Sequence, residues 1–187
     1  RAAKVIADDD LELRSIFSDI ATASLITLDG TQNDTHFVYG TDGNGALDLY
    51  VEGSAFRPPV KADFKAPDNL VCGQMMMNGT NIFLFAVKKV PQLVNEILAK
   101  NKLTTEDVDL FVFHQASYFM LEVIRKKMKL APEKVFLNIQ DYGNSVSSTI
   151  PMALYDAEKK GVLKKGMKVL LAGFGIGNSW GATIINY

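Results

Sequence analysis

The stretch VDLFVFHQAS, residues 108–117, holds an apolar run that stops at a histidine and a glutamine. A short run that is almost wholly apolar is typical of a strand covered on both faces of a sheet. The following residues, 116–129, carry apolar side chains at helical spacing. His114 therefore lies between a predicted strand and a predicted helix, where a buried apolar segment gives way to polar groups.

The alternation of strand and helix continues from here to the C-terminus. Residues 135–137 form a second short apolar run, and 145–160 have the spacing of a helix. Two further strands are expected over 168–172 and 182–187. This order predicts an α/β fold in which helices cover the faces of the sheet.

The pattern before residue 108 is less regular. A buried strand is expected over 15–28. Strands over 35–39 and 47–51 flank the turn-forming sequence GTDGNG, residues 40–45, which predicts a hairpin-like excursion.

Two segments follow this hairpin. Residues 53–70 hold three prolines and several charges and are expected to form a loop. The segment 81–100 has helically spaced apolar residues in its later part, but Pro91 leaves the start of that helix open.

The composition excludes several classes of protein. The chain has 187 residues and a net charge of −1, so no strong field favours nucleic acid or an anionic membrane. No apolar run reaches the roughly 18 residues of a membrane-spanning helix, and the first residues lack the apolar core of a signal peptide. The single cysteine, Cys72, excludes an internal disulfide framework and favours a reducing, cytoplasmic location. The sequence contains no metal-ligand spacing.

Two polar residues are candidates for a site at one edge of the sheet. His114 follows one predicted strand, and Asn144 follows the next, so both are expected beyond the carboxyl ends of strands. An imidazole there donates to an oxyanion or moves a proton, but a core histidine bonded to a carbonyl fits the position equally well. For Asn144 the alternative is a helix N-cap. The other histidine, His36, lies in a polar segment and is expected at the surface.

The sequence GFGIGNSWG, residues 173–181, has no glycine where a dinucleotide-binding loop requires one. It is expected to be a glycine-rich turn between two strands. Its backbone N–H groups could contribute to an oxyanion hole, or the glycines could simply allow a tight turn.

Three short motifs occur in one order: HQA at 114–116, YGN at 142–144, and the glycine turn ending in SWGA at 179–182. On these motifs the chain resembles the C-terminal half of the β-ketoacyl-[acyl-carrier-protein] synthase III proteins of the thiolase superfamily. The resemblance implies a thiolase-like fold, as the C-terminal half of a layered αβαβα architecture. It places residues 1–30 at the end of the N-terminal half and residues 31–187 in the C-terminal domain.

The family condenses an acyl group, held on a cysteine, with malonyl on acyl carrier protein, and releases carbon dioxide. The resemblance implies that His114 and Asn144 are catalytic and stabilise the enolate formed by this decarboxylation. Residues implied for the oxyanion hole or for substrate binding are Gly175, Ile176, Gly177 and Ser117. No cofactor and no metal is implied; acyl-coenzyme A and malonyl-acyl carrier protein are the expected substrates.

The chain also departs from the family pattern. The nucleophilic cysteine of the family lies in the first half, and Cys72 does not match it. Ser117 and Phe119 stand where the family has an asparagine and a basic residue. We therefore expect the chain to be inactive alone, with the absent N-terminal half, acyl carrier protein, acyl-coenzyme A and a second copy as partners. A non-catalytic interaction domain and another acyl-thioester enzyme of the same fold, such as an acyltransferase, remain as alternatives.

Overall fold

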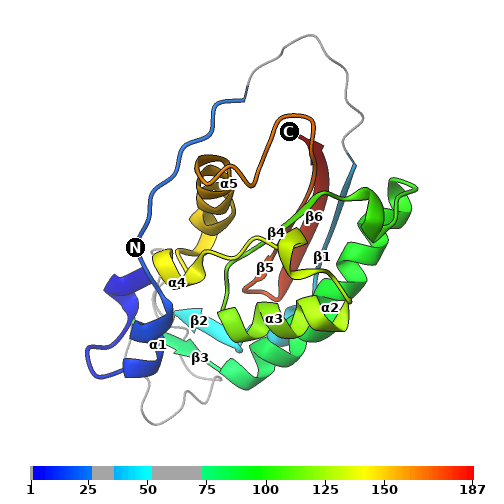
Figure 1. The fold of residues 1–187 in the computed structure, drawn as a ribbon. Helices are drawn as coiled ribbons and strands as arrows, with labels where there is room; N and C mark the ends of the chain where they lie inside the picture. Colours follow the sequence, from blue (N-terminus) through cyan, green and yellow to red (C-terminus); the bar gives the residue numbers. More distant parts are fainter. Residues whose placement is uncertain (1, 27–35, 52–72) are drawn as a thin grey trace.

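The strands and helices are those of a computed structural model that describes residues 2–26, 36–51 and 73–187 (Figure 1). The strands are β1 (Phe37–Thr41), β2 (Leu49–Val51), β3 (Met75–Met77), β4 (Leu110–Phe113), β5 (Lys168–Gly175) and β6 (Ser179–Asn186). The helices are α1 (Leu11–Ile16), α2 (Gly79–Lys100), α3 (Tyr118–Lys127), α4 (Ile139–Tyr142) and α5 (Thr149–Lys159).

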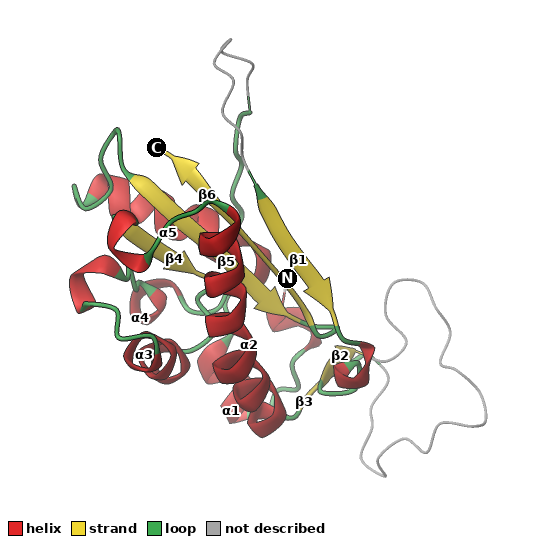
Figure 2. Cartoon of the chain, turned by 90° about the vertical axis from the view of Figure 1, so that its right-hand side faces the viewer, coloured by secondary structure: helices red, strands yellow, loops and turns green. Residues whose placement is uncertain are grey.

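The main sheet is mixed and has the strand order β1-β6-β5-β4. β4 and β5 are parallel, whereas β6 runs antiparallel to both β5 and β1. β2 and β3 form a separate antiparallel pair. Figure 2 shows the strands of the main sheet side by side, with helices on both sides of the sheet. The prediction of an α/β architecture is confirmed.

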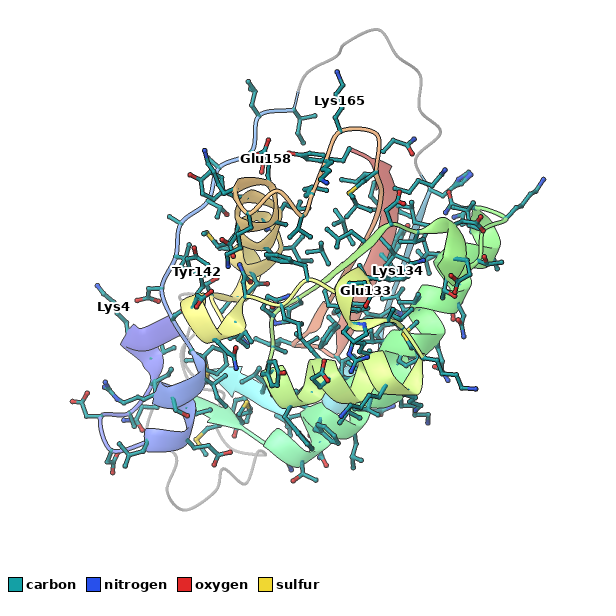
Figure 3. The ribbon with its side chains drawn as sticks, in the orientation of Figure 1. Lys4, Glu133, Lys134, Tyr142, Glu158 and Lys165 are labelled. Atoms are coloured by element: carbon teal, nitrogen blue, oxygen red, sulfur yellow. The ribbon has the colours of Figure 1, made fainter. Side chains whose placement is uncertain are left out.

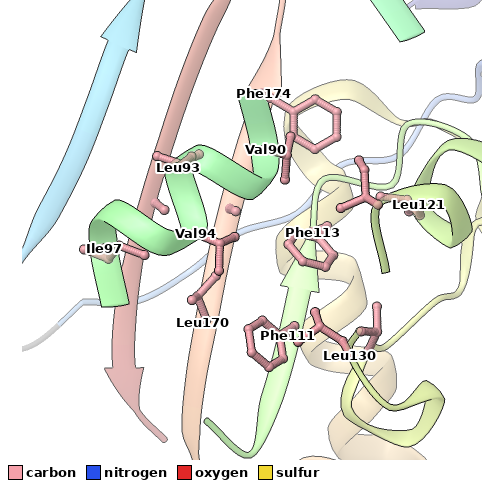
Figure 4. Close-up of a cluster of buried hydrophobic side chains, with 14 of the residues drawn as sticks. Val90, Leu93, Val94, Ile97, Phe111, Phe113, Leu121, Leu130, Leu170 and Phe174 are labelled. Carbon is pink, nitrogen blue, oxygen red and sulfur yellow. The ribbon is translucent and has the colours of Figure 1, made fainter. Parts of the chain in front are cut away.

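The larger apolar core lies between the sheet and the helices α2 and α3 (Figure 4). Leu93, Val94 and Ile97 of α2 are fully buried against Leu170 of β5 and its neighbours. Because apolar residues recur every three or four positions in α2, one face of the helix meets the sheet and the other meets water. This core fixes the position of β4, whose four residues are all buried.

Pro91 lies inside α2 rather than near its start, because the helix begins at Gly79 with Asn78 as its N-cap. A proline has no N–H to donate to the carbonyl four residues earlier, which here belongs to Val87. The Nζ atom of Lys127 in α3 donates to that carbonyl at 2.9 Å. The hydrogen bond that Pro91 cannot make is thus replaced from the neighbouring helix.

The second face of the sheet is covered by α5. Ala153 and Ala157 of this helix are fully buried against Leu110 and Val112 of β4 and Val169 of β5. β4 is covered by α2 and α3 on one face and by α5 on the other, which explains why all four of its residues are apolar.

The prediction of a strand over 15–28 is wrong for the described part of that range. The helix α1 ends at Ile16, and residues 17–26 form no strand beyond one isolated bridge between Phe17 and Asn144. Leu25 and Ile26 are more than 90% exposed. An extended apolar segment needs a neighbouring strand, and the described residues offer none here. Residues 27 and 28 lie outside the described residues.

The predicted hairpin around the glycine-rich turn is also wrong. β1 and β2 flank the turn, but β1 pairs with β6 and β2 pairs with β3. The turn contains a short 3₁₀ helix at Gly43–Gly45, capped by the Asp42 side chain, which turns β2 away from β1. The expected loop over 53–70 lies outside the described residues, as does Cys72.

Other elements also differ from the predictions, in existence or in length. The run 135–137 makes only one isolated bridge, between Val135 and Phe111, and is not a strand. The helix expected over 145–160 begins at Thr149, because residues Val146–Ser148 form a 3₁₀ turn first. β4, β5 and β6 lie where the sequence places them, and β5 and β6 are longer than expected.

In Figure 3 the side chains of Lys4 and Lys165 point outward from the ribbon. None of the helices in the described ranges is long and apolar enough to cross a membrane.

Candidate functional site

Two adjoining cavities, of about 1010 and 720 Å³, lie where β4 and β5 end. His114 and Asn144 line both of them. The other residues shared by the two cavities are Phe17, Leu49, Phe174 and Gly175. The two predicted catalytic side chains therefore face the same space, although 30 residues and two helices separate them in the chain.

His114 continues the β4 strand by one residue. Its backbone N–H donates to the Ala172 carbonyl of β5 at 2.8 Å, and the edge of its ring packs against Phe174 with centroids 5.5 Å apart. Burial among these apolar groups lowers the pKa of His114 to about 4. The imidazole is therefore neutral at neutral pH.

Gln115 is buried and ties the end of β4 to the segment that follows α3. Its amide nitrogen donates to the carbonyls of Phe113 at 2.9 Å and Phe136 at 3.3 Å. Its side-chain oxygen accepts from the backbone N–H of Asn138 at 3.1 Å. Gln115 therefore has a structural role, because it holds the end of β4 against residues 136–138. Of the two polar residues that follow the strand, His114 is the one that faces the cavities.

The backbone of Asn144 is held by the segment after α1. Its N–H donates to the Ile16 carbonyl at 2.8 Å, and its carbonyl accepts from the Ser18 N–H at 2.9 Å. Gly143 precedes it with φ of +67°, and a Cβ there would lie 3.0 Å from the Cβ of Ser18. Glycine is required at this position both by its backbone conformation and by the close approach of Ser18.

The side chain of Asn144 is oriented by the next turn. Its Oδ1 accepts from the backbone N–H of Val146 at 2.9 Å, so the other end of the amide must be the NH₂ group. Nδ2 makes a long contact, 3.4 Å, with the Ala116 carbonyl. One N–H of Asn144 has no acceptor among the described residues and can donate to a ligand. Asn144 is not the N-cap of α5, which is Ser148.

The remaining predicted site residues are spread around the cavities. Gly175 and Ile176, at the tip of the β5–β6 hairpin, line the larger cavity, whereas Gly177 lines neither. Ser117 lines the smaller cavity, and its hydroxyl accepts from the Met120 N–H at 3.3 Å as the N-cap of α3. His36 is half-buried rather than at the open surface; its carbonyl accepts from the Thr183 hydroxyl at 2.8 Å.

The sequence reading missed Thr149 and Val146. Thr149 is 2% exposed, and its Oγ1 lies 2.7 Å from Nδ1 of His114. Val146 has φ of +57°, a conformation that β-branched residues rarely adopt. The run of small hydroxyl residues after Asn144 was a signal for close packing, but it does not distinguish Thr149 from its neighbours. The described residues contain no cluster of three or more His, Cys, Asp or Glu side chains that could hold a metal ion.

Residues 98–187 match the family model described as 3-oxoacyl-[acyl-carrier-protein (ACP)] synthase III C terminal. The chain is similar to the β-ketoacyl-[acyl-carrier-protein] synthase III of Nitratidesulfovibrio vulgaris strain Miyazaki F, with 36% identity over 173 residues; the match covers 92% of this chain and 51% of that protein. It is also 32% identical over 185 residues to the protein of that name from Clostridium acetobutylicum, covering 99% of this chain and 56% of the relative. The chain thus spans about half the length of these curated relatives.

Solved structures show the same relationship. A crystal structure of 3-oxoacyl-(acyl-carrier-protein) synthase III superposes with a TM-score of 0.83 and 34% identity, covering 100% of this chain and 58% of that one. The structure of the Thermus thermophilus β-ketoacyl-[acyl carrier protein] synthase III superposes with a TM-score of 0.80 and 32% identity, covering 99% and 56% of the two chains. The thiolase-like fold expected from the sequence is confirmed.

Proposed function

Since the chain belongs to the β-ketoacyl-[acyl-carrier-protein] synthase III family and matches its C-terminal half, we propose that it supplies the decarboxylating half of a condensing site. The reaction is the condensation of an acyl thioester with malonyl on acyl carrier protein. His114 and Asn144 are the proposed catalytic residues, and they stabilise the enolate. Gly175, Ile176, Gly177 and Ser117 are the proposed oxyanion-hole and substrate-binding residues.

One observation carries this proposal: His114 and Asn144 line the same two cavities, and the amide of Asn144 can only present its NH₂ group there. A fixed N–H donor aimed at a developing negative charge is the arrangement that lowers the barrier of enolate formation. His114 adds a neutral imidazole, whose pKa of about 4 leaves it uncharged under working conditions.

In the proposed step, the bond between the malonyl carboxylate and its methylene carbon breaks and carbon dioxide leaves. The electron pair of that bond moves onto the thioester carbonyl oxygen, which becomes an enolate oxygen. Hydrogen bonds from Asn144 and His114 stabilise this oxygen. The enolate carbon then attacks the acyl group on the cysteine, and the cysteine thiolate is the leaving group, so the product is a 3-ketoacyl thioester.

The nucleophilic cysteine of this proposal belongs to the N-terminal half of the family, which this chain does not match. The chain alone is therefore proposed to be inactive, and it acts when joined to that half, as a homodimer, with acyl-coenzyme A and acyl carrier protein as partners and without a cofactor or metal. The half-buried Ser117, already used as a helix cap, and the exposed Phe119 replace two polar family residues. The acyl carrier protein is therefore held by other groups here.

The test is to incubate the full-length gene product with a radiolabelled short acyl-coenzyme A and malonyl-acyl carrier protein, and to measure carbon dioxide release. His114→Ala and Asn144→Ala should each lower the rate roughly 10²- to 10³-fold, the range found when one oxyanion donor is removed. His36→Ala is the matched control, because it removes the other histidine of this chain and leaves the cavities intact.

The other outcomes separate the alternatives. Acylation without carbon dioxide release would identify an acyltransferase. No acylation by several chain lengths would favour a non-catalytic interaction domain. Carbon dioxide release that is unchanged in both variants would show that His114 and Asn144 do not carry the reaction.

A further inference from the structure

Two hydrogen bonds of Thr149 determine where the proton of His114 lies. The Thr149 hydroxyl donates to the Val146 carbonyl at 3.0 Å, and its Oγ1 also lies 2.7 Å from Nδ1 of His114. A hydroxyl has one proton to donate. Because that proton is engaged by Val146, the contact with His114 is a hydrogen bond only if Nδ1 carries the proton and Oγ1 accepts it.

This arrangement leaves Nε2 of His114 as an acceptor. A neutral imidazole has one N–H, and burial lowers the pKa of His114 to about 4, so a second proton is not present at neutral pH. An acceptor cannot stabilise an enolate oxygen. The proposed function, on which this inference rests, requires the other tautomer, with the proton on Nε2.

Thr149 can favour either tautomer. If its hydroxyl proton turns from the Val146 carbonyl to Nδ1 of His114, then Nδ1 becomes an acceptor and the imidazole proton belongs on Nε2. The number of protons on the two side chains is unchanged; the imidazole loses one from Nδ1 and gains one at Nε2 by exchange with water. The Val146 carbonyl is not orphaned, because the backbone N–H of Thr149 also donates to it.

We propose that Thr149 is a positioning residue that selects the tautomer of His114, donating to Val146 in the unliganded chain and to Nδ1 when an oxygen acceptor binds at Nε2. The backbone of Val146 links the two catalytic side chains. Its N–H orients Asn144, and its carbonyl holds the resting position of the Thr149 hydroxyl. One residue with φ of +57° thus aligns the amide directly and the imidazole through Thr149.

Nitrogen-15 NMR of the histidine side chains in the 187-residue chain tests this proposal without any catalysis. The chain has two histidines, so His36 gives an internal reference in every spectrum. At neutral pH we expect His114 with its proton on Nδ1. Thr149→Val keeps the shape but offers no acceptor, so the proton should move to Nε2. Thr149→Ser keeps the hydroxyl and should keep the proton on Nδ1.

The unmodified chain alone can overturn the proposal, because a proton on Nε2 of His114 in its spectrum would contradict the resting state. So would a Thr149→Val spectrum, from a chain with unchanged circular dichroism, in which the proton stays on Nδ1.

Activity of the full-length gene product gives the second readout. Thr149→Val leaves the proton of His114 on Nε2 but removes the hydroxyl that would donate to Nδ1 and hold the ring in place when the ligand binds. We therefore expect kcat to fall about tenfold with little change in KM, and Thr149→Ser to restore it. If His114→Ala leaves the rate unchanged, the proposed function fails while the NMR result stands. If His114→Ala abolishes the rate but Thr149→Val does not lower kcat, the tautomer proposal fails alone.

Discussion

The apolar core beneath α2 and the polar turn at residues 143–149 are stabilised by opposite means. In the core, Leu93 and Ile97 are fully buried and depend on the volume that they fill. In the turn, Val146 is 44% exposed, and its backbone groups bond to Asn144 and Thr149. The core therefore depends on side-chain volume, whereas the turn depends on backbone direction and tolerates an unfavourable conformation to obtain it.

The largest expected effect is in the core. Leu93→Ala should lower the free energy of unfolding by about 2 to 5 kcal/mol, because it removes buried methyl groups and leaves a cavity that the sheet and α2 cannot close. Urea unfolding of the 187-residue chain, followed by circular dichroism, measures this change.

Leu84→Ala is the matched control, since Leu84 lies on the same helix but is 59% exposed. This substitution should change stability by no more than about 0.5 kcal/mol. Equal losses in the two variants would mean that the face of α2 assigned to the core is wrong.

The second effect concerns His114, which lies at the border between the two regions. Its native pKa of about 4 is below its ordinary value of 6.5. As the pH falls from 6.5 to 4, the unfolded chain binds a proton that the native chain does not, so stability is lost on acidification. The loss approaches about 3 kcal/mol at pH 4.

Urea unfolding at several pH values gives this slope. His114→Gln should remove the part of the slope between pH 6.5 and 4. The pKa values of Asp107 and Glu122 are lowered by their hydrogen bonds to Thr104 and Arg125. The stability that these two carboxylates give to the native chain is therefore lost as the pH falls below their ordinary pKa values. An unchanged slope in His114→Gln would show that the imidazole is not buried as a neutral group.

The smallest effect has the opposite sign. Val146→Gly removes three carbon atoms, as Leu93→Ala does, but here the side chain is exposed and the backbone has φ of +57°. Relief of this conformation should exceed the added freedom of the unfolded chain, so we expect a gain of about 0.5 kcal/mol. If urea unfolding instead shows that Val146→Gly lowers the free energy of unfolding by about 1 kcal/mol or more, the side chain of Val146 stabilises the turn as buried side chains stabilise the core. The two regions would then not differ in how they are stabilised.

The fold was most predictable where strands and helices alternate over short distances. The run ending at His114 and the helices after it have local periodicity, and the structure follows it from β4 to β6 except at residues 135–137, which make one isolated bridge. The pairing of β1 was not predictable in this way, since its neighbour β6 lies about 140 residues further along the chain. A glycine-rich turn between two short strands predicts a hairpin, and only the distant partner decides against it.

In the site, too, residues with a local signal in the sequence were predictable, and residues defined by contacts with distant segments were not. His114 and Asn144 stand out because each follows an apolar run and belongs to a recognisable motif. Thr149 lies among three serines and has no distinguishing feature in the sequence, and nothing marks Val146 as a residue with positive φ. The importance of Thr149 comes from its contact with His114, which exists only after α5 has packed on the sheet.

The position of β6 has a consequence for synthesis on the ribosome. β6 lies between β5 and β1, yet it is the last of these strands to leave the ribosomal exit tunnel. Until β6 is synthesised, β5 presents an unpaired edge, and β1 has no neighbour in its sheet. Pairing β1 with β6 closes a loop of about 140 residues, which is entropically unfavourable and slow. Nascent chains are therefore most exposed to edge-to-edge aggregation just before synthesis of β6, when a chaperone that binds extended segments would protect them most.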